Sequence, residues 1–403
     1  MTTPMREIAT VAVLGAGTMG SGIAQVAAEA GLDVLLHDPV AGATERALER
    51  IGGFLHRKVE KGQLEADAAA DALARIRAVP MLEELVAADL VVEAIPESLD
   101  LKRDAFRRLD AATAPDAILA TNTSSLSVAR IAAATDRPER VVGMHFFNPV
   151  PLMSLVEVIA GPMTSTEVAD SAALLARRLG KTPVVAADTP GFIVNRVQRA
   201  YYLEAYRILE GGVAGIEAID AAMRGIGFRM GPFELADTVG TDVNLAAGVA
   251  IYEGFFGDPR FRPALVQQRV VDAGRLGRKS GAGYYDYGAD GSRGAPWSAL
   301  RSPGLLAHLD APQIEARVLA AIVNEAASAV ADGVAVPPAI DTAMRLASNW
   351  PEGPLAWGER IGLASVVHTL DALHAAVPDG RYRVQPLLRA LADGGGSFVG
   401  ERG

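Results

Sequence analysis

The segment from Val141 to Ile159 contains a histidine and a glutamate, His145 and Glu157, whose side chains together could do acid–base chemistry. A histidine oriented by a carboxylate can take the proton of an alcohol while a nicotinamide cofactor takes the hydride. The carboxylate would fix the imidazole tautomer and stabilise the imidazolium that forms. This pair predicts dehydrogenase chemistry if the chain also holds a dinucleotide.

Both residues also have ordinary structural explanations. A single histidine at the end of an apolar strand is more often a satisfied core residue than a catalyst. Glu157 lies in the alternating run LVEVI, which is typical of a strand with one solvent-facing side. The position of His145 favours chemistry, because the sites of open α/β sheets lie at the carboxyl ends of strands and Val141–Met144 leads directly into this histidine.

A glycine-rich turn, GAGTMG, follows the apolar run Ala9–Leu14 and precedes an alanine-rich helix over Ser21–Gly31. By itself the G-x-G-x-x-G pattern is weak evidence, but between a strand and a helix it is typical of a dinucleotide-binding turn. The first glycine permits the turn, the second lets the backbone approach the pyrophosphate, and the third lets the helix pack on the sheet. The residues expected at the cofactor phosphates are Gly15, Ala16, Gly17, Thr18, Met19 and Gly20.

An aspartate, Asp38, ends the second apolar run, Val34–Leu36, soon after the glycine turn. A carboxylate there would accept hydrogen bonds from the adenosine ribose and repel a 2′-phosphate, so NAD is favoured over NADP. The alternative is an ordinary turn residue before Pro39. A further polar stretch, Thr121–Ser127, supplies hydroxyl and amide groups after another apolar run, either for a ligand or as helix N-caps.

Composition limits the number of domains and the kinds of partner that we expect. The chain has 403 residues, half of them hydrophobic, which is enough for two or three domains. Cysteine is absent, which fits a reducing compartment, and we expect a cytoplasmic protein. A net charge of −10 argues against nucleic-acid or membrane-surface partners, no apolar run reaches the length of a membrane span, and no residue pattern predicts a metal site.

Short apolar runs alternate with helical patterns over the first 187 residues and predict a parallel sheet with helices on both faces. The expected strands include Leu90–Val92, Ile118–Ala120 and Val141–Met144, and the expected helices include Ala41–Lys61 and Asp67–Arg77. The fold class is therefore a Rossmann-type, doubly wound α/β domain.

After Asp188–Arg196 the pattern becomes helical, with amphipathic stretches over Ile193–Leu209 and Ile216–Ile226. Residues 288–304 are rich in glycine, serine and proline and predict a linker or exposed loop. A shift of 121 positions then matches residues of the helical region with the C-terminal part, including Arg196 with Arg317, Glu204 with Glu325, Gly212 with Gly333 and Asp220 with Asp341. We infer that the all-α domain is duplicated. The second copy is expected to be structural, because it has no nucleotide-binding domain of its own and has Ala316 in place of Asn195.

Seven motifs occur together and in order, namely GAGTMGSGIA, TNTSSL, HFFNPV, LVEVI, DTPGFIVNR, GPFELAD and GRKSGAGYYDY. Over about residues 7 to 287 they resemble the L-3-hydroxyacyl-CoA dehydrogenase family. The resemblance implies that His145 is the general base and Glu157 its orienting carboxylate, while Ser124 and Asn195 hold the 3-oxygen and neighbouring carbonyl of an acyl-CoA. It also implies an NAD site lined by Glu97, Lys102, Ser124, Asn148 and Lys279, with Lys58 and Lys61 as candidates for the CoA phosphates.

The expected domains are an NAD-binding domain over residues 1–187, a helical substrate and dimerisation domain over 188–290, and a degenerate copy over 304–403. The extra copy resembles longer bacterial members, including 3-hydroxyadipyl-CoA dehydrogenases of phenylacetate degradation. The helical domain of short members mediates dimerisation, so we expect a homodimer or a monomer with an internal pseudo-dimer. Two alternatives stay open: a related NAD-dependent dehydrogenase of a free hydroxy acid or carnitine-like substrate, and a catalytically silent NAD-binding protein.

Overall fold

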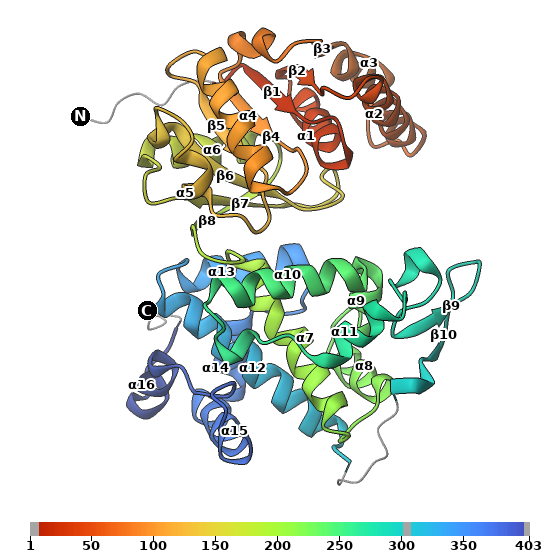
Figure 1. Ribbon diagram of the computed structural model, residues 1–403, viewed down its shortest axis with the longest axis vertical. Helices are drawn as coiled ribbons and strands as arrows, with labels where there is room; N and C mark the ends of the chain where they lie inside the picture. Colours follow the sequence, from red (N-terminus) through yellow and green to blue (C-terminus); the bar gives the residue numbers. More distant parts are fainter. Residues whose placement is uncertain (1–7, 301–307, 399–403) are drawn as a thin grey trace. The chain divides into compact units, whose positions relative to one another are not determined.

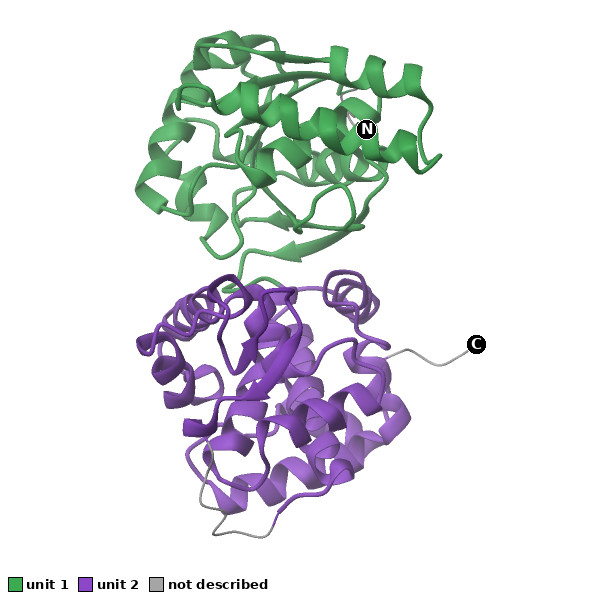
Figure 2. Ribbon diagram, turned by 90° about the vertical axis from the view of Figure 1, so that its right-hand side faces the viewer, with its two compact units in different colours: residues 1–192 green, residues 193–403 purple. Residues whose placement is uncertain are grey.

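The computed structural model describes residues 8–300 and 308–398. Residues 1–7, 301–307 and 399–403, which fall within the predicted domains and linker, lie outside the described residues. The chain divides into two compact units, one up to Phe192 and one from Ile193 onward, coloured separately in Figure 2. Within the described residues, no helix has both the length and the apolar character that a membrane crossing needs.

The first unit is built on an eight-stranded sheet in the order β3-β2-β1-β4-β5-β6-β7-β8 (Figure 1). Neighbouring strands pair in parallel except β6 and β7, which pair antiparallel. The order reverses between β1 and β4, where a doubly wound sheet binds its ligand. The strands are β1 (Thr10–Leu14), β2 (Asp33–His37), β3 (Ile76–Ala78), β4 (Leu90–Glu93), β5 (Ile118–Thr121), β6 (Val141–Phe146), β7 (Leu155–Ala160) and β8 (Thr182–Ala187).

Both faces of this sheet are covered, because successive side chains of each strand point to opposite sides. Val11 and Val13 of β1 belong to one core cluster, and Ala12 and Leu14 belong to the other. The first cluster contains side chains of α1 (Thr18–Glu29), α2 (Ala43–Glu60), α3 (Ala66–Ala74) and α6 (Thr166–Arg178). The second contains side chains of α4 (Leu99–Ala112), α5 (Val128–Ala132) and the 3₁₀ turn η1 (Leu82–Ala87). The predicted Rossmann-type fold is confirmed.

The second unit is mainly helical and contains one short hairpin that was not predicted. Its strands are β9 (Tyr285–Tyr287) and β10 (Arg293–Pro296), so the prediction of a linker or loop is wrong for β10. The residues of β10 are RGAP, which form neither an apolar run nor an apolar–polar alternation, so the sequence carries no strand signal there. The helices are α7 (Val194–Glu210), α8 (Ile216–Gly225), α9 (Pro232–Val239), α10 (Thr241–Gly254), α11 (Leu265–Asp272), α12 (Ala311–Ala331), α13 (Pro337–Ser348), α14 (Pro354–Ile361), α15 (Leu363–Ala376) and α16 (Pro386–Gly394).

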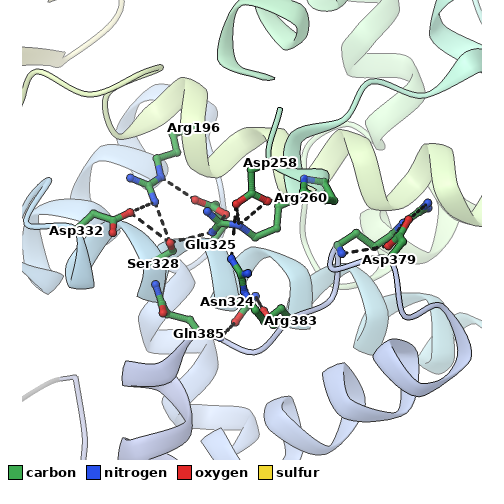
Figure 3. A network of polar contacts seen from close by, with 12 residues as sticks. Arg196, Asp258, Arg260, Asn324, Glu325, Ser328, Asp332, Asp379, Arg383 and Gln385 are labelled. Carbon is green, nitrogen blue, oxygen red and sulfur yellow. Dashed lines mark hydrogen bonds and ion pairs between the residues drawn. The ribbon is translucent and has the colours of Figure 1, made fainter. Parts of the chain in front are cut away.

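The duplication predicted from the sequence is visible in reciprocal contacts between α7 and α12, which pack against each other. Arg196 Nε donates to Glu325 Oε1 at 2.7 Å, and the equivalent Arg317 Nε donates to Glu204 Oε1 at 2.9 Å. Each arginine therefore binds the other copy's glutamate, as residues do across a two-fold axis. Around Glu325 the network extends to Arg260, whose Nη1 donates to Oε2 at 2.9 Å (Figure 3).

A second equivalence concerns the first turns of α9 and α14. Asp220 of α8 accepts hydrogen bonds from the backbone N–H groups of Phe233 and Glu234, at 3.0 and 3.1 Å. In the second copy, the carboxylate of Asp341 accepts from the corresponding amides, Leu355 N and Ala356 N. Each aspartate satisfies N–H groups that have no partner within their own helix.

The surroundings of Asp220 predict that stability depends on pH. Burial raises the pKa of this carboxyl to about 7 against the opposing hydrogen bonds from Phe233 and Tyr285. A raised acid pKa means that the folded state holds the proton more tightly, so the stabilising contribution is full at low pH and is lost as pH rises from about 4 to about 7. We expect this residue to lower the free energy of unfolding by about 3 kcal/mol between pH 5 and pH 8.

The measurement is urea unfolding at both pH values for the wild type, Asp220→Asn and Glu217→Gln, an exposed carboxylate of the same helix. Asp220→Asn should flatten the slope, and Glu217→Gln should retain it. An unchanged slope in Asp220→Asn would contradict the assignment.

Candidate active site

The register of β6 and β7 places His145 directly opposite Glu157. His145 Nδ1 lies 2.7 Å from Glu157 Oε2, and the glutamate is fully buried. Glu157 therefore does not face solvent, and the alternative of an exposed strand residue is wrong. Because a carboxylate accepts hydrogen bonds, this contact places the hydrogen on Nδ1 and leaves the lone pair on Nε2.

Two aromatic rings pack beside the imidazole. The Phe147 ring centre lies 4.4 Å from that of His145, and the Phe192 ring centre lies at 6.0 Å. Asn122 holds the end of β6 in place, because its Oδ1 accepts a hydrogen bond from Phe146 N at 2.8 Å. Sequence reasoning did not single out Asn122, although it lies in the polar stretch that was noted.

The structure gives a separate reason for each glycine of the turn. Gly15 has a φ of +104°, and a Cβ there would lie 2.7 Å from Ala94 O. A Cβ at Gly20 would lie 1.8 Å from Gly15 O, so the helix can approach the turn only with glycine at this position. Gly17 differs, because no atom lies within 4 Å of a Cβ built there. The protein itself does not require glycine at position 17, which fits the close approach of a diphosphate to the N-terminus of α1.

A cavity of about 810 Å³ opens at this turn, beyond the carboxyl ends of β1, β2 and β4. Asp38 lines it, and its two oxygens accept from Ala16 N at 2.7 Å and from Val40 N at 2.8 Å. Each oxygen keeps a lone pair for a ribose hydroxyl. The position, volume and donor set fit a dinucleotide. Arg50, which sequence reasoning missed, donates to Ala16 O at 2.7 Å and holds the turn from α2.

A third cluster joins the ends of β4 and β5. Glu97 Oε1 accepts hydrogen bonds from the hydroxyls of Thr123 and Ser124, at 2.7 and 3.3 Å. Lys102 lies behind Glu97, 3.4 Å from its Oε2. Ser127, at the end of the polar stretch, caps α5 by accepting from Arg130 N, which confirms the N-cap expected there.

The chain is similar to known proteins over most of its length. Residues 10–189 match the model of the 3-hydroxyacyl-CoA dehydrogenase NAD-binding domain, and residues 191–287 and 314–397 each match the model of its C-terminal domain. The chain belongs to the 3-hydroxyacyl-CoA dehydrogenase family. It is an oxidoreductase whose cofactor is NAD.

Some relatives match nearly the whole of this dehydrogenase, and others match about 70% of it. A 3-hydroxyadipyl-CoA dehydrogenase of Escherichia coli is 39% identical over 96% of this chain and 98% of its own. A 3-hydroxybutyryl-CoA dehydrogenase of Bradyrhizobium diazoefficiens is 46% identical over 70% of this chain and 96% of its own. The crystal structure of a 3-hydroxybutyryl-CoA dehydrogenase from E. coli superposes with a TM-score of 0.89 at 38% identity, covering 96% of this chain and all of the other.

Only some of the predicted cofactor residues of this dehydrogenase line the cavity. Gly15, Gly17, Thr18 and Met19 line the cavity with Asp38, but Ala16, Gly20, Glu97, Lys102, Ser124 and Asn148 do not. Asn148 is exposed in the loop between β6 and β7. Lys279 and Asn195 belong to the second unit, where Lys279 pairs with Asp242 at 2.7 Å and Asn195 lies in the first turn of α7. Their contacts with ligands stay predictions.

The two lysines expected at the CoA phosphates differ in their surroundings. Lys58 pairs with Glu29 of α1, whereas Lys61 is exposed beyond the end of α2. Lys61 therefore has the more accessible ammonium group, and its role stays a prediction. Among the residues that the structure describes, no group of three or more His, Asp or Glu side chains could hold a metal ion.

Replacing Gly17 by alanine tests the phosphate site. We expect the free energy of unfolding to change by about 1 kcal/mol or less, because the site has space and its φ of −69° suits alanine. The dissociation constant of NADH, measured by fluorescence titration, should rise at least about tenfold. Gly53→Ala in α2 is the control and should leave NADH affinity unchanged. Unchanged NADH affinity in Gly17→Ala would refute the placement of the diphosphate.

Proposed function

We propose that the protein catalyses the reversible oxidation of an (S)-3-hydroxyacyl-CoA to the 3-oxoacyl-CoA, with His145 as general base. The observation that carries this proposal is the 2.7 Å contact between His145 Nδ1 and the buried Glu157. NAD, when bound, accepts the hydride that leaves C3. His145 Nε2 takes the hydroxyl proton, and Glu157 stabilises the resulting imidazolium.

Ser124 and Asn195 are proposed to hold the 3-oxygen and the neighbouring carbonyl of the substrate. Ser124 follows β5 at the same edge of the sheet as His145, which supports a shared task. The presence of Ser124, His145, Glu157 and Asn195 together argues against a catalytically silent NAD-binding protein.

The acyl group is proposed to be of the 3-hydroxybutyryl or 3-hydroxyadipyl class, since these are the substrates in the names of the relatives. The test is the loss of NADH absorbance with acetoacetyl-CoA and, in parallel, with 3-oxoadipyl-CoA. Turnover with either establishes the CoA-linked reaction, and the ratio of kcat/KM values separates a short-chain enzyme from a dicarboxylate one. Activity with free 3-oxo acids alone would favour the related dehydrogenase of a free hydroxy acid.

We also propose that the second helical copy, 304–403, is structural and forms a pseudo-dimer with residues 188–290 of the same chain. The reciprocal pairs Arg196–Glu325 and Arg317–Glu204 support this division. Light scattering of the purified protein would distinguish a monomer from a homodimer. A cytoplasmic location stays a prediction.

His145→Gln tests the general base. We expect kcat to fall by roughly 100-fold to 10,000-fold, because glutamine cannot accept the hydroxyl proton, while the dissociation constant of NADH stays unchanged. His56→Gln, at an exposed histidine of α2, is the control and should retain full turnover. Near-normal turnover in His145→Gln would remove this residue from the mechanism.

A further inference from the structure

A buried cation lies behind the loop that carries Ser124. Lys102 of α4 is only 1% exposed, and its Nζ donates to Glu93 Oε1 at 2.5 Å and to Ile95 O at 3.3 Å. Glu93 is the last residue of β4 and is fully buried. The same ammonium lies 3.4 Å from Glu97 Oε2, so one cation lies between two carboxylates.

The two carboxylates hold the last residue of β5 and the chain segment that follows it. Glu93 Oε2 accepts from Thr121 Oγ1 at 2.7 Å. Glu97 Oε1 gathers donors from three successive residues: the hydroxyl of Thr123, the N–H and hydroxyl of Ser124, and the N–H and hydroxyl of Ser125. The conformation of this loop therefore depends on where Glu97 is held.

We propose that Lys102 is a positioning residue, which with Glu93 fixes Glu97 and through it sets the place of Ser124 for the substrate. The inference rests on the proposed function, in which Ser124 holds the 3-oxygen. It differs from the cofactor contact that the resemblance implied for Lys102, because this ammonium is buried and already surrounded by carboxylate and carbonyl oxygens.

The electrostatics of the cluster agree with this role. Partial burial alone would raise the pKa of Glu97, but the Lys102 ammonium and the donors from Thr123, Ser124 and Ser125 outweigh it and hold the pKa below its ordinary value. Removal of the ammonium would leave Glu93 and Glu97 as unbalanced neighbours with like charge. A buried charge that loses its partner is strongly destabilising, so the loop would relax away from its present position.

The experiment uses Lys102→Met, which keeps much of the side chain but removes the charge. Hydrogen exchange followed by mass spectrometry would report on the amides of Ser124 and Ser125, which donate to Glu97. We expect their exchange to become at least about tenfold faster and kcat to fall roughly 10-fold to 100-fold. The dissociation constant of NADH should stay within about threefold of the wild-type value.

Two further variants separate positioning from loss of stability. Glu93→Gln combined with Lys102→Met removes the uncompensated carboxylate, so it should recover thermal stability but not kcat, since Glu97 still lacks its cation. Arg103→Met removes an exposed cation from the same helix and is the matched control, expected to leave exchange and kcat unchanged.

The outcomes are distinct. A rise of tenfold or more in the dissociation constant of NADH, with unchanged kcat and exchange, would make Lys102 a cofactor ligand and overturn the proposal. Recovery of kcat in the double variant, or unchanged kcat in Lys102→Met despite faster exchange, would also overturn it. A wild-type protein without acyl-CoA turnover would instead refute the proposed function and with it the catalytic purpose of the loop, while the exchange data would still decide whether Lys102 holds Ser124 and Ser125.

Discussion

The antiparallel pairing of β6 with β7 is the constraint on which the candidate active site depends. The reversal places Glu157 within the strand beside His145 and directly opposite it. A slip of one residue in this register would turn Glu157 to the other face of the sheet. The hydrogen bonds of a backbone ladder thus define the geometry of the proposed catalytic pair.

Buried charges recur in both units, and each has specific partners. Lys102 lies between Glu93 and Glu97 in the first unit, and Arg196 meets Glu325 in the second. Such pairs contribute little net stability against an apolar alternative, because desolvation offsets their attraction. They do penalise every arrangement in which a partner is missing. In the first unit this selects one conformation of the loop after β5, and in the second it selects one packing of the two copies.

The residues that are repeated in the two helical copies differ in role from the one that is not. The reciprocal ion pairs hold the two copies against each other, and the two helix-capping aspartates, Asp220 and Asp341, hold helices together within each copy. Asn195 is not repeated, since its counterpart is Ala316. The copy thus keeps residues that stabilise helices and lacks a residue expected at the substrate.

Patterns of short range were sufficient to predict much of the fold from the sequence. The strand, glycine turn and helix around Gly15–Gly20 follow from local chemistry, and so does the helical character of the second unit; its repeat follows from residue matches at a constant shift of 121 positions. Local patterns were misleading where pairing with a distant segment decides the structure. The helix expected to reach Arg77 ends at Ala74, because Ile76 and Arg77 pair with β2, and β10 forms only because β9 lies beside it.

The sequence by itself determined which chemistry is available: a histidine after an apolar strand, a glutamate in an alternating run, and a glycine turn beside an aspartate. Only the tertiary structure decided that Glu157 faces His145 and that Lys102 is buried between two carboxylates. It also decided that Asn122 holds the end of β6 and that Arg50 holds the glycine turn. The physical reason is that these contacts join strands and helices far apart in the chain. Which side chain lies opposite which depends on sheet order and register, and a single sequence does not encode these in any local pattern.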